Sequence, residues 1–376
     1  MTPKVAQFLA ESRPATPCLV LDIDRVEDNF RAIHQALPLA RIYYAVKANP
    51  AAPILERLVS LGSSFDAASF EEVRMCLDAG AAPLEISFGN TIKKISAIQG
   101  AYAAGVTMFA FDSQEELEKL AKHAPGSRVY CRLLVENKGA DWPLSRKFGT
   151  TVQSARDLMI RAAELGLDPY GLSFHVGSQQ MDTAAYEVAI GQVGMLFTDL
   201  RDAGVNIRMV NLGGGFPVRY REEVPTVDKF ANAIMHAMTE HFGNDLPEIL
   251  IEPGRSMVGN AGVVHAEVVL VSRRIPGDPT RWVYLDIGRF GGLAETEGES
   301  IKYRIETQHD GDATGPVCIA GPTCDGADIM YERSNYQLPL SLEMGETVNL
   351  MSTGAYVTTY ASQRFNGFAP LAEHYI

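Results

Sequence analysis

The sequence is short of positive charge and lacks both a long apolar run and a closely spaced cysteine pair. Lysine and arginine number 33 against 46 aspartates and glutamates, which gives a net charge of −13 at pH 7. A chain this acidic repels nucleic-acid phosphates and anionic lipids, so we expect neither as a partner. No run approaches the roughly 20 apolar residues that cross a bilayer, and the first residues lack the apolar core of a secretory signal.

Cysteine is scarce, with five in the chain and no CxxC pair. An odd number of unpaired thiols indicates a reducing compartment and predicts a cytoplasmic location. Metal-ligand spacing is also missing, because His236 and His241 are off the i, i+4 spacing of one helix face, and Cys318 and Cys324 lack zinc-knuckle spacing. We therefore expect no catalytic metal ion, which argues against a metal-dependent barrel hydrolase.

The first two-thirds of the chain alternates short apolar runs with segments of helical period. Eight runs occur, at residues 41–46, 63–67, 84–88, 107–111, 129–134, 171–176, 209–212 and 248–251. Strand–helix alternation with strands buried on both faces predicts a parallel sheet. Eight such units in about 230 residues match the size of a (β/α)8 barrel.

A second domain is expected because the 376 residues of the chain exceed what one core can hold, roughly 250–300 residues. Strand-like runs follow one another late in the chain, at residues 263–271, 281–286, 301–305, 317–320 and 347–351. Few helical stretches separate them, which predicts an antiparallel β domain, and a strand at residues 17–22 is expected to join it. The expected fold class is α/β, with a barrel at residues 23–258 and a C-terminal β domain at residues 1–22 and 259–376.

Reactive residue types follow several predicted barrel strands, at the end where barrel enzymes carry their active sites. In chain order they are Lys47, Asp66, His175 with Ser178, Gly213-Gly214-Gly215, and Glu252 with Gly254 and Arg255. A lysine partly withdrawn from water is a nucleophile for a carbonyl group. Consecutive glycines let backbone N–H groups approach a phosphate, and an arginine provides a planar donor for the same anion.

Each of these features has an ordinary explanation when it is taken singly. Lys47 could be a solvated strand end, His175 a hydrogen-bonded structural histidine, and Glu252 with Arg255 a surface ion pair. The GGGFP turn does not match the GxGxxG dinucleotide pattern. Their joint occurrence at one predicted face favours pyridoxal phosphate. Lys47 would hold its aldehyde as a Schiff base, and Glu252 would keep its pyridine nitrogen protonated.

The same stretches resemble a known family. The motifs are YAVKAN (44–49), FDAAS (65–69), SFHVGS (173–178), GGGFP (213–217), EPGR (252–255), GPTCDG (321–326), GAY (354–356) and FNGF (365–368). They are similar to those of the pyridoxal-phosphate ornithine/lysine decarboxylase family, which is part of the alanine-racemase-like fold group, in its compact bacterial type. The resemblance implies a barrel plus a β domain and a head-to-tail homodimer with two active sites at its interface.

The resemblance also assigns roles to single residues. The implied cofactor-binding set is Lys47, Asp66, His175, Ser178, Gly214, Gly215, Glu252, Gly254, Arg255 and Tyr356. Within it, Lys47 is the Schiff-base lysine, His175 stacks on the ring and Glu252 is the partner of the ring nitrogen. Cys324 and Asp325 would come from the neighbouring subunit, with Cys324 as the proton donor to the substrate Cα.

One segment departs from the pattern of eukaryotic members. Those carry a tyrosine and an aspartate in the part that corresponds to residues 290–303 here. We align Glu299, or else Glu295 or Glu297, with that aspartate. The length of the substrate side chain is therefore the least determined property.

The expected reaction is decarboxylation of L-ornithine to putrescine in polyamine biosynthesis, with L-lysine to cadaverine left open as a second activity. Asp325 would pair with the distal ammonium of a substrate that Phe365 also contacts. One methylene changes binding by only about 1–3 kcal/mol, so dual activity is expected to be feasible. The alternatives left open are a diaminopimelate or arginine decarboxylase of the same fold and a non-catalytic regulatory homologue. A racemase of this fold places an arginine at the ring nitrogen, so Glu252 speaks against racemisation.

Overall fold

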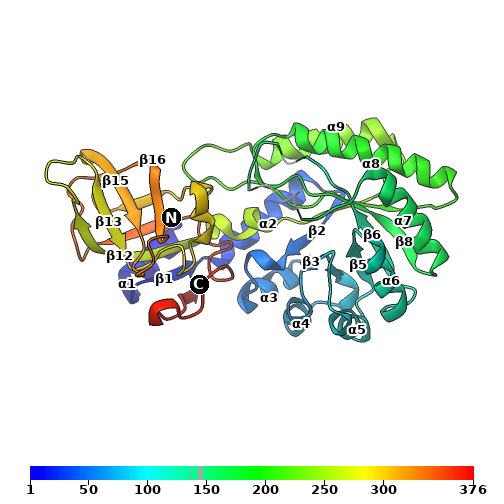
Figure 1. The fold of residues 1–376 in the computed structure, drawn as a ribbon, viewed down its shortest axis with the longest axis horizontal. Coiled ribbons are helices and arrows are strands. Elements are labelled where there is room, and N and C mark those ends of the chain that lie inside the picture. Colours follow the sequence, from blue (N-terminus) through cyan, green and yellow to red (C-terminus); the bar gives the residue numbers. More distant parts are fainter. Residues whose placement is uncertain (137, 143–146) are drawn as a thin grey trace. The chain divides into compact units, whose positions relative to one another are not determined.

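The chain divides into two compact units (Figure 1). The computed structural model describes residues 1–136, 138–142 and 147–376. The barrel unit comprises residues 27–217 and 224–257, and the β unit comprises residues 1–26, 218–223 and 258–376. The short segment 218–223 belongs to the β unit, which the predicted boundaries did not include. In the part of the chain that is described, no helix is both long and apolar enough to cross a bilayer.

Eight parallel strands close into a barrel, which confirms the predicted fold class. They are β2 (Ala40–Ala45), β3 (Ser64–Ala67), β4 (Ile86–Phe88), β5 (Met108–Phe111), β6 (Arg128–Arg132), β8 (Asp168–Ser173), β10 (Met209–Asn211) and β11 (Glu248–Ile251). The closed order is β10-β11-β2-β3-β4-β5-β6-β8, and each strand overlaps one predicted run. A separate two-stranded ladder joins β7 (Ala140–Trp142) to β9 (Ser178–Gln180).

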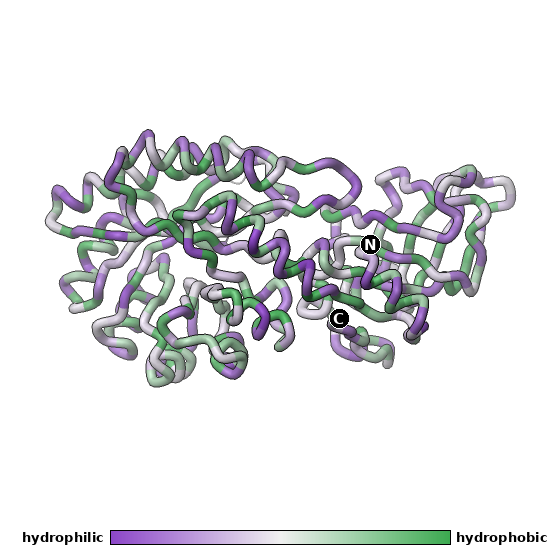
Figure 2. Tube along the Cα trace, turned by 180° about the vertical axis from the view of Figure 1, so that it is seen from behind, coloured by the Kyte–Doolittle hydropathy of each residue, from purple (hydrophilic) through white to green (hydrophobic). Residues whose placement is uncertain are grey.

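Helices connect successive barrel strands. The connecting helices are α3 (Ala52–Ser60), α4 (Phe70–Asp78), α5 (Ile95–Ala103), α6 (Gln114–His123), α7 (Val152–Glu164), α8 (Ala184–Asp202) and α9 (Val227–Phe242). In addition, α2 (Ile23–Ala36) precedes β2, and the short α10 (Arg255–Val258) follows β11. Their turns alternate between hydrophobic and hydrophilic residues (Figure 2), as in helices that cover a sheet on one side. Ser69 and Ser113 cap α4 and α6, because their hydroxyl oxygens accept the N–H groups of Glu72 and Glu116.

The interior of the barrel is a packed core. Buried side chains from several strands meet there, among them Tyr43, Tyr130, Tyr170, Met209 and Leu250. A filled barrel has no channel along its axis, so a ligand has to bind at one end. The polar residues predicted on the barrel, such as Lys47, Asp66 and Glu252, lie at or just after the carboxyl ends of its strands, which is the end where barrel enzymes bind their substrates.

The β unit is a mixed sheet that is mainly antiparallel. Its strands are β1 (Cys18–Leu21), β12 (Gly262–Ser272), β13 (Arg281–Leu285), β14 (Ile305–Thr307), β15 (Thr314–Ala320), β16 (Ile329–Pro339), β17 (Thr347–Met351) and β18 (Ala372–Tyr375). The path runs β14-β17-β12-β13-β15-β16, and β1 pairs with both β12 and β18. The first strand therefore joins the late part of the chain, as predicted. Two pairs, β13 with β15 and β1 with β18, are parallel.

Strand boundaries in the β unit differ from the prediction at one run. Residues 301–305 alternate in polarity and were expected to form a strand, but β14 begins only at Ile305. Tyr303 is buried, and its N–H donates to the hydroxyl of Tyr331 at 2.8 Å, so it pairs with a side chain and not with a neighbouring strand. The strand β16 was not predicted, because it is rich in polar residues and ends in Pro339.

Candidate active site

Lys47 and Asp66 lie together at the carboxyl end of the barrel unit. Lys47 follows β2 in a single 3-10 turn, and Asp66 belongs to β3. The Nζ atom of Lys47 is 3.5 Å from Oδ2 of Asp66, whose side chain is only 3% exposed. The other oxygen, Oδ1, is buried without a hydrogen-bond partner among the described residues. A buried carboxylate oxygen without a partner is costly unless a ligand satisfies it, so the pair indicates a binding site.

The glycine run after β10 brings backbone close to backbone. Gly213 and Gly215 have φ values of 66° and 113°, which side chains other than glycine rarely adopt. A Cβ on Gly214 would lie 2.5 Å from the carbonyl oxygen of Glu252, and one on Gly215 would lie 2.5 Å from that of Gly177. The run therefore requires glycine, and it leaves a concave stretch of backbone suited to an anion.

Arg255 and Ser178 provide polar side chains in the same unit. The guanidinium of Arg255 donates to Oγ of Ser178 from Nε at 3.2 Å and from Nη2 at 3.1 Å. Arg255 is 3% exposed, so its charge is largely withdrawn from water. A buried guanidinium with a hydroxyl group is a typical donor set for a phosphate.

Glu252 follows β11 and is held by a neighbouring side chain. Asn211, the last residue of β10, donates from Nδ2 to Oε1 of Glu252 and accepts the N–H of Gly213 through its own Oδ1 at 2.9 Å. Burial, and then the negative charge of Asp66, raise the pKa of Glu252 to about 7. Its carboxyl group therefore exchanges a proton close to neutral pH.

His175 follows β8 and is neutral. Its Nδ1 accepts the N–H of Gly177 at 3.0 Å. Burial, followed by the positive charges of Arg132 and Lys47, holds the pKa of His175 well below its ordinary value. A neutral imidazole held by its own backbone is a flat surface against which an aromatic ring can stack.

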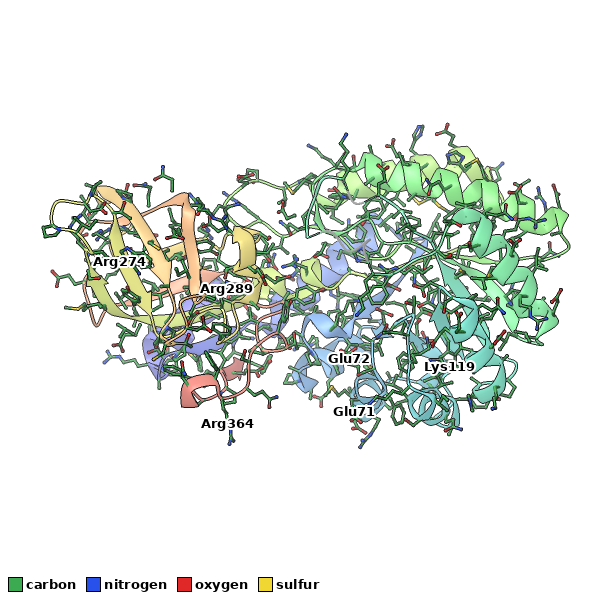
Figure 3. The ribbon with its side chains drawn as sticks, in the orientation of Figure 1. Glu71, Glu72, Lys119, Arg274, Arg289 and Arg364 are labelled. Carbon is green, nitrogen blue, oxygen red and sulfur yellow. The ribbon has the colours of Figure 1, made fainter. Side chains whose placement is uncertain are left out.

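The predicted residues Cys324 and Asp325 occupy an exposed loop of the β unit. Buried Asp328 anchors this loop: its Oδ1 accepts the N–H of Arg289 at 2.8 Å, and its Oδ2 accepts the N–H and hydroxyl of Thr323 at 3.1 and 2.7 Å. Arg289, labelled in Figure 3, also donates from Nη1 to the carbonyl of Ala327 at 2.8 Å. The thiol of Cys324 is exposed, whereas the other four cysteines are buried.

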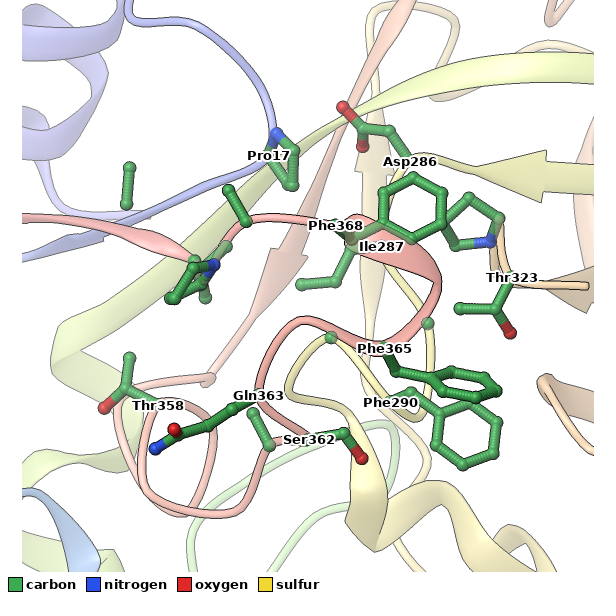
Figure 4. A pocket seen from close by; sticks show the side chains of 18 of the residues that line it. Pro17, Asp286, Ile287, Phe290, Thr323, Thr358, Ser362, Gln363, Phe365 and Phe368 are labelled. Carbon is green, nitrogen blue, oxygen red and sulfur yellow. The ribbon is translucent and has the colours of Figure 1, made fainter. Parts of the chain in front are cut away.

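Phe365 and Phe290 line a cavity of about 520 Å³ in the β unit, next to the Cys324 loop. Their rings lie against each other (Figure 4), with centroids 5.0 Å apart. The cavity wall also includes Thr323, the residue before Cys324. Tyr356 belongs to the same unit and has a φ of 57°.

Glu299 uses its carboxylate within the β unit. Oε1 accepts the N–H groups of Glu332 and Arg333 at 2.8 and 2.6 Å. Burial works to raise the pKa of Glu299, but the hydrogen bonds from the backbone of Arg333 and Glu332 outweigh it and lower the pKa. Contact between Glu299 and a substrate therefore stays a prediction, and the observed bonds engage Oε1 elsewhere.

A comparison with known families decides the identity of the chain. The family described as "Pyridoxal-dependent decarboxylase, pyridoxal binding domain" matches residues 23–259. The chain belongs to the pyridoxal-dependent decarboxylases. This decarboxylase is 34% identical over 370 residues to the lysine/ornithine decarboxylase of Selenomonas ruminantium, covering 98% of this chain and 91% of the relative.

Solved structures of decarboxylases share the whole fold. The structure of lysine/ornithine decarboxylase complexed with cadaverine from Vibrio vulnificus is 29% identical, with a TM-score of 0.89, and the match covers 100% of this chain and 99% of that one. The arginine decarboxylase of Paramecium bursaria Chlorella virus bound to agmatine is 27% identical, with a TM-score of 0.91 and coverage of 100% of both chains. Membership of the family and the prediction of pyridoxal phosphate as cofactor are confirmed.

The barrel residues of the decarboxylase fit this cofactor. The partnerless oxygen of Asp66 beside Lys47, the glycine run, the Arg255–Ser178 pair and the flat neutral ring of His175 all belong to one unit. Of the predicted cofactor-binding residues, Tyr356 lies on the β unit. The roles of the individual residues stay predictions.

Three further residues of the decarboxylase site were not predicted from the sequence. Asn211 orients Glu252, and Arg132, at the end of β6, has its pKa lowered by burial while the charge of Glu252 acts to raise it. Glu72, labelled in Figure 3, accepts the N–H of Ala68 at 2.6 Å, and burial raises its pKa. Arg132 was missed because the predicted strand, 129–134, continued past it, whereas β6 ends there.

Proposed function

We propose that the protein decarboxylates L-ornithine to putrescine and, as a second activity, L-lysine to cadaverine, supplying diamines for polyamine biosynthesis. The observation that carries the proposal is Asp325, whose exposed carboxylate follows directly after Cys324. Its Oδ1 accepts the N–H of Ala327 at 2.8 Å, which fixes the carboxylate on the loop. A fixed, exposed carboxylate suits the distal ammonium group that ornithine and lysine share. The Selenomonas relative is itself named for both amino acids.

Lys47, Glu252 and His175 have distinct tasks in this proposal. The bound cofactor supplies an electron sink for the electrons left when the bond between Cα and the carboxylate breaks. Lys47 binds the aldehyde and is held in place by Asp66. Glu252, with its pKa raised to about 7, would be the residue that supplies a proton to the ring nitrogen and the negative charge that keeps it protonated. Neutral His175 covers one ring face and adds no positive charge of its own.

The phosphate is bound by Gly214, Gly215, Ser178 and Arg255, in the proposal. Tyr186 supports this region, because its hydroxyl donates to the carbonyl of Gly214 at 2.7 Å and holds the glycine run in place. Gly254 precedes Arg255 and its carbonyl accepts the N–H of Met257. Tyr356 of the β unit is a further proposed phosphate ligand.

Cys324 is the proposed proton donor to Cα. Its thiol is exposed, and the preceding residue, Thr323, is hydrogen-bonded to Asp328. In the proposal two subunits form a homodimer, and Cys324 and Asp325 of one complete the site of the other. Phe365 contacts the substrate from the same unit as Cys324.

The test is turnover on a substrate panel. Purified protein with pyridoxal phosphate is given L-ornithine, L-lysine, L-arginine and diaminopimelate, and carbon dioxide and the amine product are measured. We expect carbon dioxide release from both ornithine and lysine. Their kcat/KM values should lie within about 200-fold of each other, because the two substrates differ by one methylene. Exclusive release from arginine or diaminopimelate would contradict the proposal.

Arginine decarboxylation is the second candidate, because the viral arginine decarboxylase matches the whole chain in fold. The substrate panel separates the two cases, and the Asp325→Ala variant tests whether Asp325 contacts the substrate. Loss of activity on ornithine with cofactor affinity unchanged assigns Asp325 to the substrate. A regulatory homologue without activity is disfavoured because Lys47, Glu252 and Cys324 are all present.

A cytoplasmic location stays a prediction. All five cysteines, each within the described residues, are free, which supports a reducing compartment.

A further inference from the structure

Asn366 reaches the backbone of Cys324 from a distant part of the β unit. Its Oδ1 accepts the N–H of Cys324 at 2.9 Å, across 42 positions of the chain. We propose that Asn366 is a positioning residue that fixes the direction of the Cys324 thiol for proton delivery to Cα. This inference rests on the proposed function, because it takes Cys324 to be the proton donor.

The backbone of Asn366 explains why asparagine occupies this position. Asn366 lies in the 3-10 turn Phe365–Gly367 with a φ of 51°, in the left-handed region, and Arg364 and Gly367 on either side also have positive φ values of 57° and 83°. Asparagine tolerates this region better than other residues with a side chain. It thus combines a tight turn with a side-chain acceptor, which glycine and alanine cannot do.

The turn that carries Asn366 is itself attached to the rest of the β unit. Phe365 packs on Phe290 (Figure 4), and their ring centroids are 5.0 Å apart. The carbonyl of Phe290 accepts the N–H of Ser362 at 2.9 Å, four residues before Asn366. Asn366 is therefore a defined attachment point for the cysteine loop.

The other attachment of the loop ends one residue short of the cysteine. Asp328 binds the N–H and hydroxyl of Thr323, so it holds the stem of the loop. Residues 324–327 are exposed. The bond to Asn366 is the next one along the chain, and it acts on the residue that carries the thiol.

Packing gives the loop little support on one side. The lining of the cavity of about 520 Å³ includes Pro322 and Thr323 on the loop, as well as Phe365 and Phe368. Because the stem borders a cavity, packing on that side is reduced, and we expect the hydrogen bond to Asn366 to matter more for the position of the adjacent cysteine. Loss of this hydrogen bond is expected to let the thiol move away from the position in which it donates a proton, without unfolding the domain.

Three variants separate the acceptor from the backbone. Asn366→Gly keeps the left-handed turn and removes the acceptor, Asn366→Asp keeps the acceptor, and Asn335→Gly is the matched control. Asn335 also has a left-handed φ, of 48°, and is exposed in β16, where its Oδ1 accepts from Gln337 at 2.9 Å.

The first measurement needs neither cofactor nor substrate. Cys324 is the exposed cysteine, so iodoacetamide labels it selectively in the folded, cofactor-free protein, and the labelled peptide is identified by mass spectrometry. Asn366→Gly is expected to label about 2- to 10-fold faster than wild type, the factor that one hydrogen bond is worth. Asn366→Asp and Asn335→Gly are expected to label at the wild-type rate.

The second measurement follows the proton in the holoenzyme. The products report where the proton is delivered: the diamine indicates delivery to Cα, and an aldehyde, with the cofactor recovered in its amine form, would indicate delivery to the cofactor instead. In Asn366→Gly the aldehyde fraction is expected to rise, with kcat down about 10-fold and KM for ornithine changed less than about 2-fold. Asn366→Asp is expected to restore the diamine.

Wild-type labelling and wild-type product from Asn366→Gly would overturn the inference, as would an Asn366→Asp variant as impaired as the glycine variant. Failure of the proposed function is distinguishable from this result. It would appear as a wild-type protein that releases no carbon dioxide from any basic amino acid, and the labelling experiment would still show whether Asn366 restrains Cys324.

Discussion

At the scale of single residues, burial shifts the pKa values of two residues of the site. Glu252 and His175 are both enclosed in the barrel unit, and burial shifts both toward the neutral form: the pKa of the glutamate rises to about 7, and that of the histidine falls well below its ordinary value. Each shift suits its proposed task, since the acid can give up a proton near neutral pH and the imidazole stays uncharged. Two neighbours also act on the pKa of Glu252: the charge of Asp66 raises it, and the hydrogen bond from Asn211 lowers it.

Replacement of Lys47 by alanine is expected to abolish covalent attachment of the cofactor, because the amine that binds the aldehyde is lost. The measurement is the visible absorbance of the holoenzyme, together with borohydride reduction and mapping of the labelled peptide. Lys229→Ala, at an exposed position of α9, is the control and should keep both signals. A label on any peptide other than the one containing Lys47 would contradict the assignment.

The raised pKa of Glu252 has a consequence for stability. The folded state holds a proton on Glu252 up to about pH 7, whereas the unfolded chain releases it near pH 4.5. The cofactor-free wild type should therefore lose stability as the pH rises from about 4.5 to 7, by about 3 kcal/mol relative to Glu252→Gln. Urea unfolding across this range measures the difference.

Exposed Glu240→Gln is the control for that experiment and should follow the wild-type curve. In the holoenzyme, Glu252→Gln is expected to lower kcat by about 100- to 10,000-fold, since an amide cannot supply the proton or the negative charge. Parallel stability curves for wild type and Glu252→Gln would show that Glu252 is not shifted.

At the scale of elements, the strands and their following turns carry most of what the sequence predicts. Each barrel strand overlaps a predicted apolar run because a strand buried on both faces has to be apolar along its whole length. The sequence predicts the ends of strands less well than their middles. Arg132 and Asn211 each occupy the last position of a strand, where a shift of one residue decides whether a side chain belongs to the core or to the site. The prediction of a strand at residues 301–305 was wrong over most of its length. Alternating polarity also occurs in a buried, irregular segment whose backbone N–H groups donate to tyrosine hydroxyls.

Replacement of Asp328 by alanine is expected to destabilise the loop that carries Cys324. The carboxylate accepts three hydrogen bonds, and their donors would be left unpaired in a region where Asp328 is only 2% exposed. We expect a loss of about 3 kcal/mol in the free energy of unfolding, measured by urea titration. Asp245→Ala, at an exposed site, should change it by less than about 0.5 kcal/mol. A stable Asp328→Ala protein would show that the loop is held in another way.

At the scale of the whole molecule, the proposed residues belong to two units. Lys47, His175 and Glu252 lie on the barrel unit, and Cys324 and Asp325 lie on the β unit. Two units of one chain, or of two chains, can bring such groups together. In the proposed homodimer the two units come from different chains. This arrangement predicts a result that a site formed within one chain cannot give.

Mixing two inactive variants tests the shared site. Lys47→Ala and Cys324→Ala are each expected to have little activity, and a mixture in equal amounts, allowed to exchange subunits, should regain about a quarter of wild-type activity. Half of the dimers are then mixed, and each contains one site with both residues intact. Activity no greater than the average of the two variants would place Lys47 and Cys324 of one chain in the same site.

The sequence by itself determined the barrel, the β domain and the family, because these depend on periodicity and on motifs that are continuous along the chain. The glycine run and the residues after the strands were recognisable for the same reason. Only the tertiary structure decided the neighbours: the partnerless oxygen of Asp66, the contact of Asn211 with Glu252 and that of Asn366 with Cys324. These depend on burial and on hydrogen bonds between residues far apart in the chain, and no local pattern encodes them.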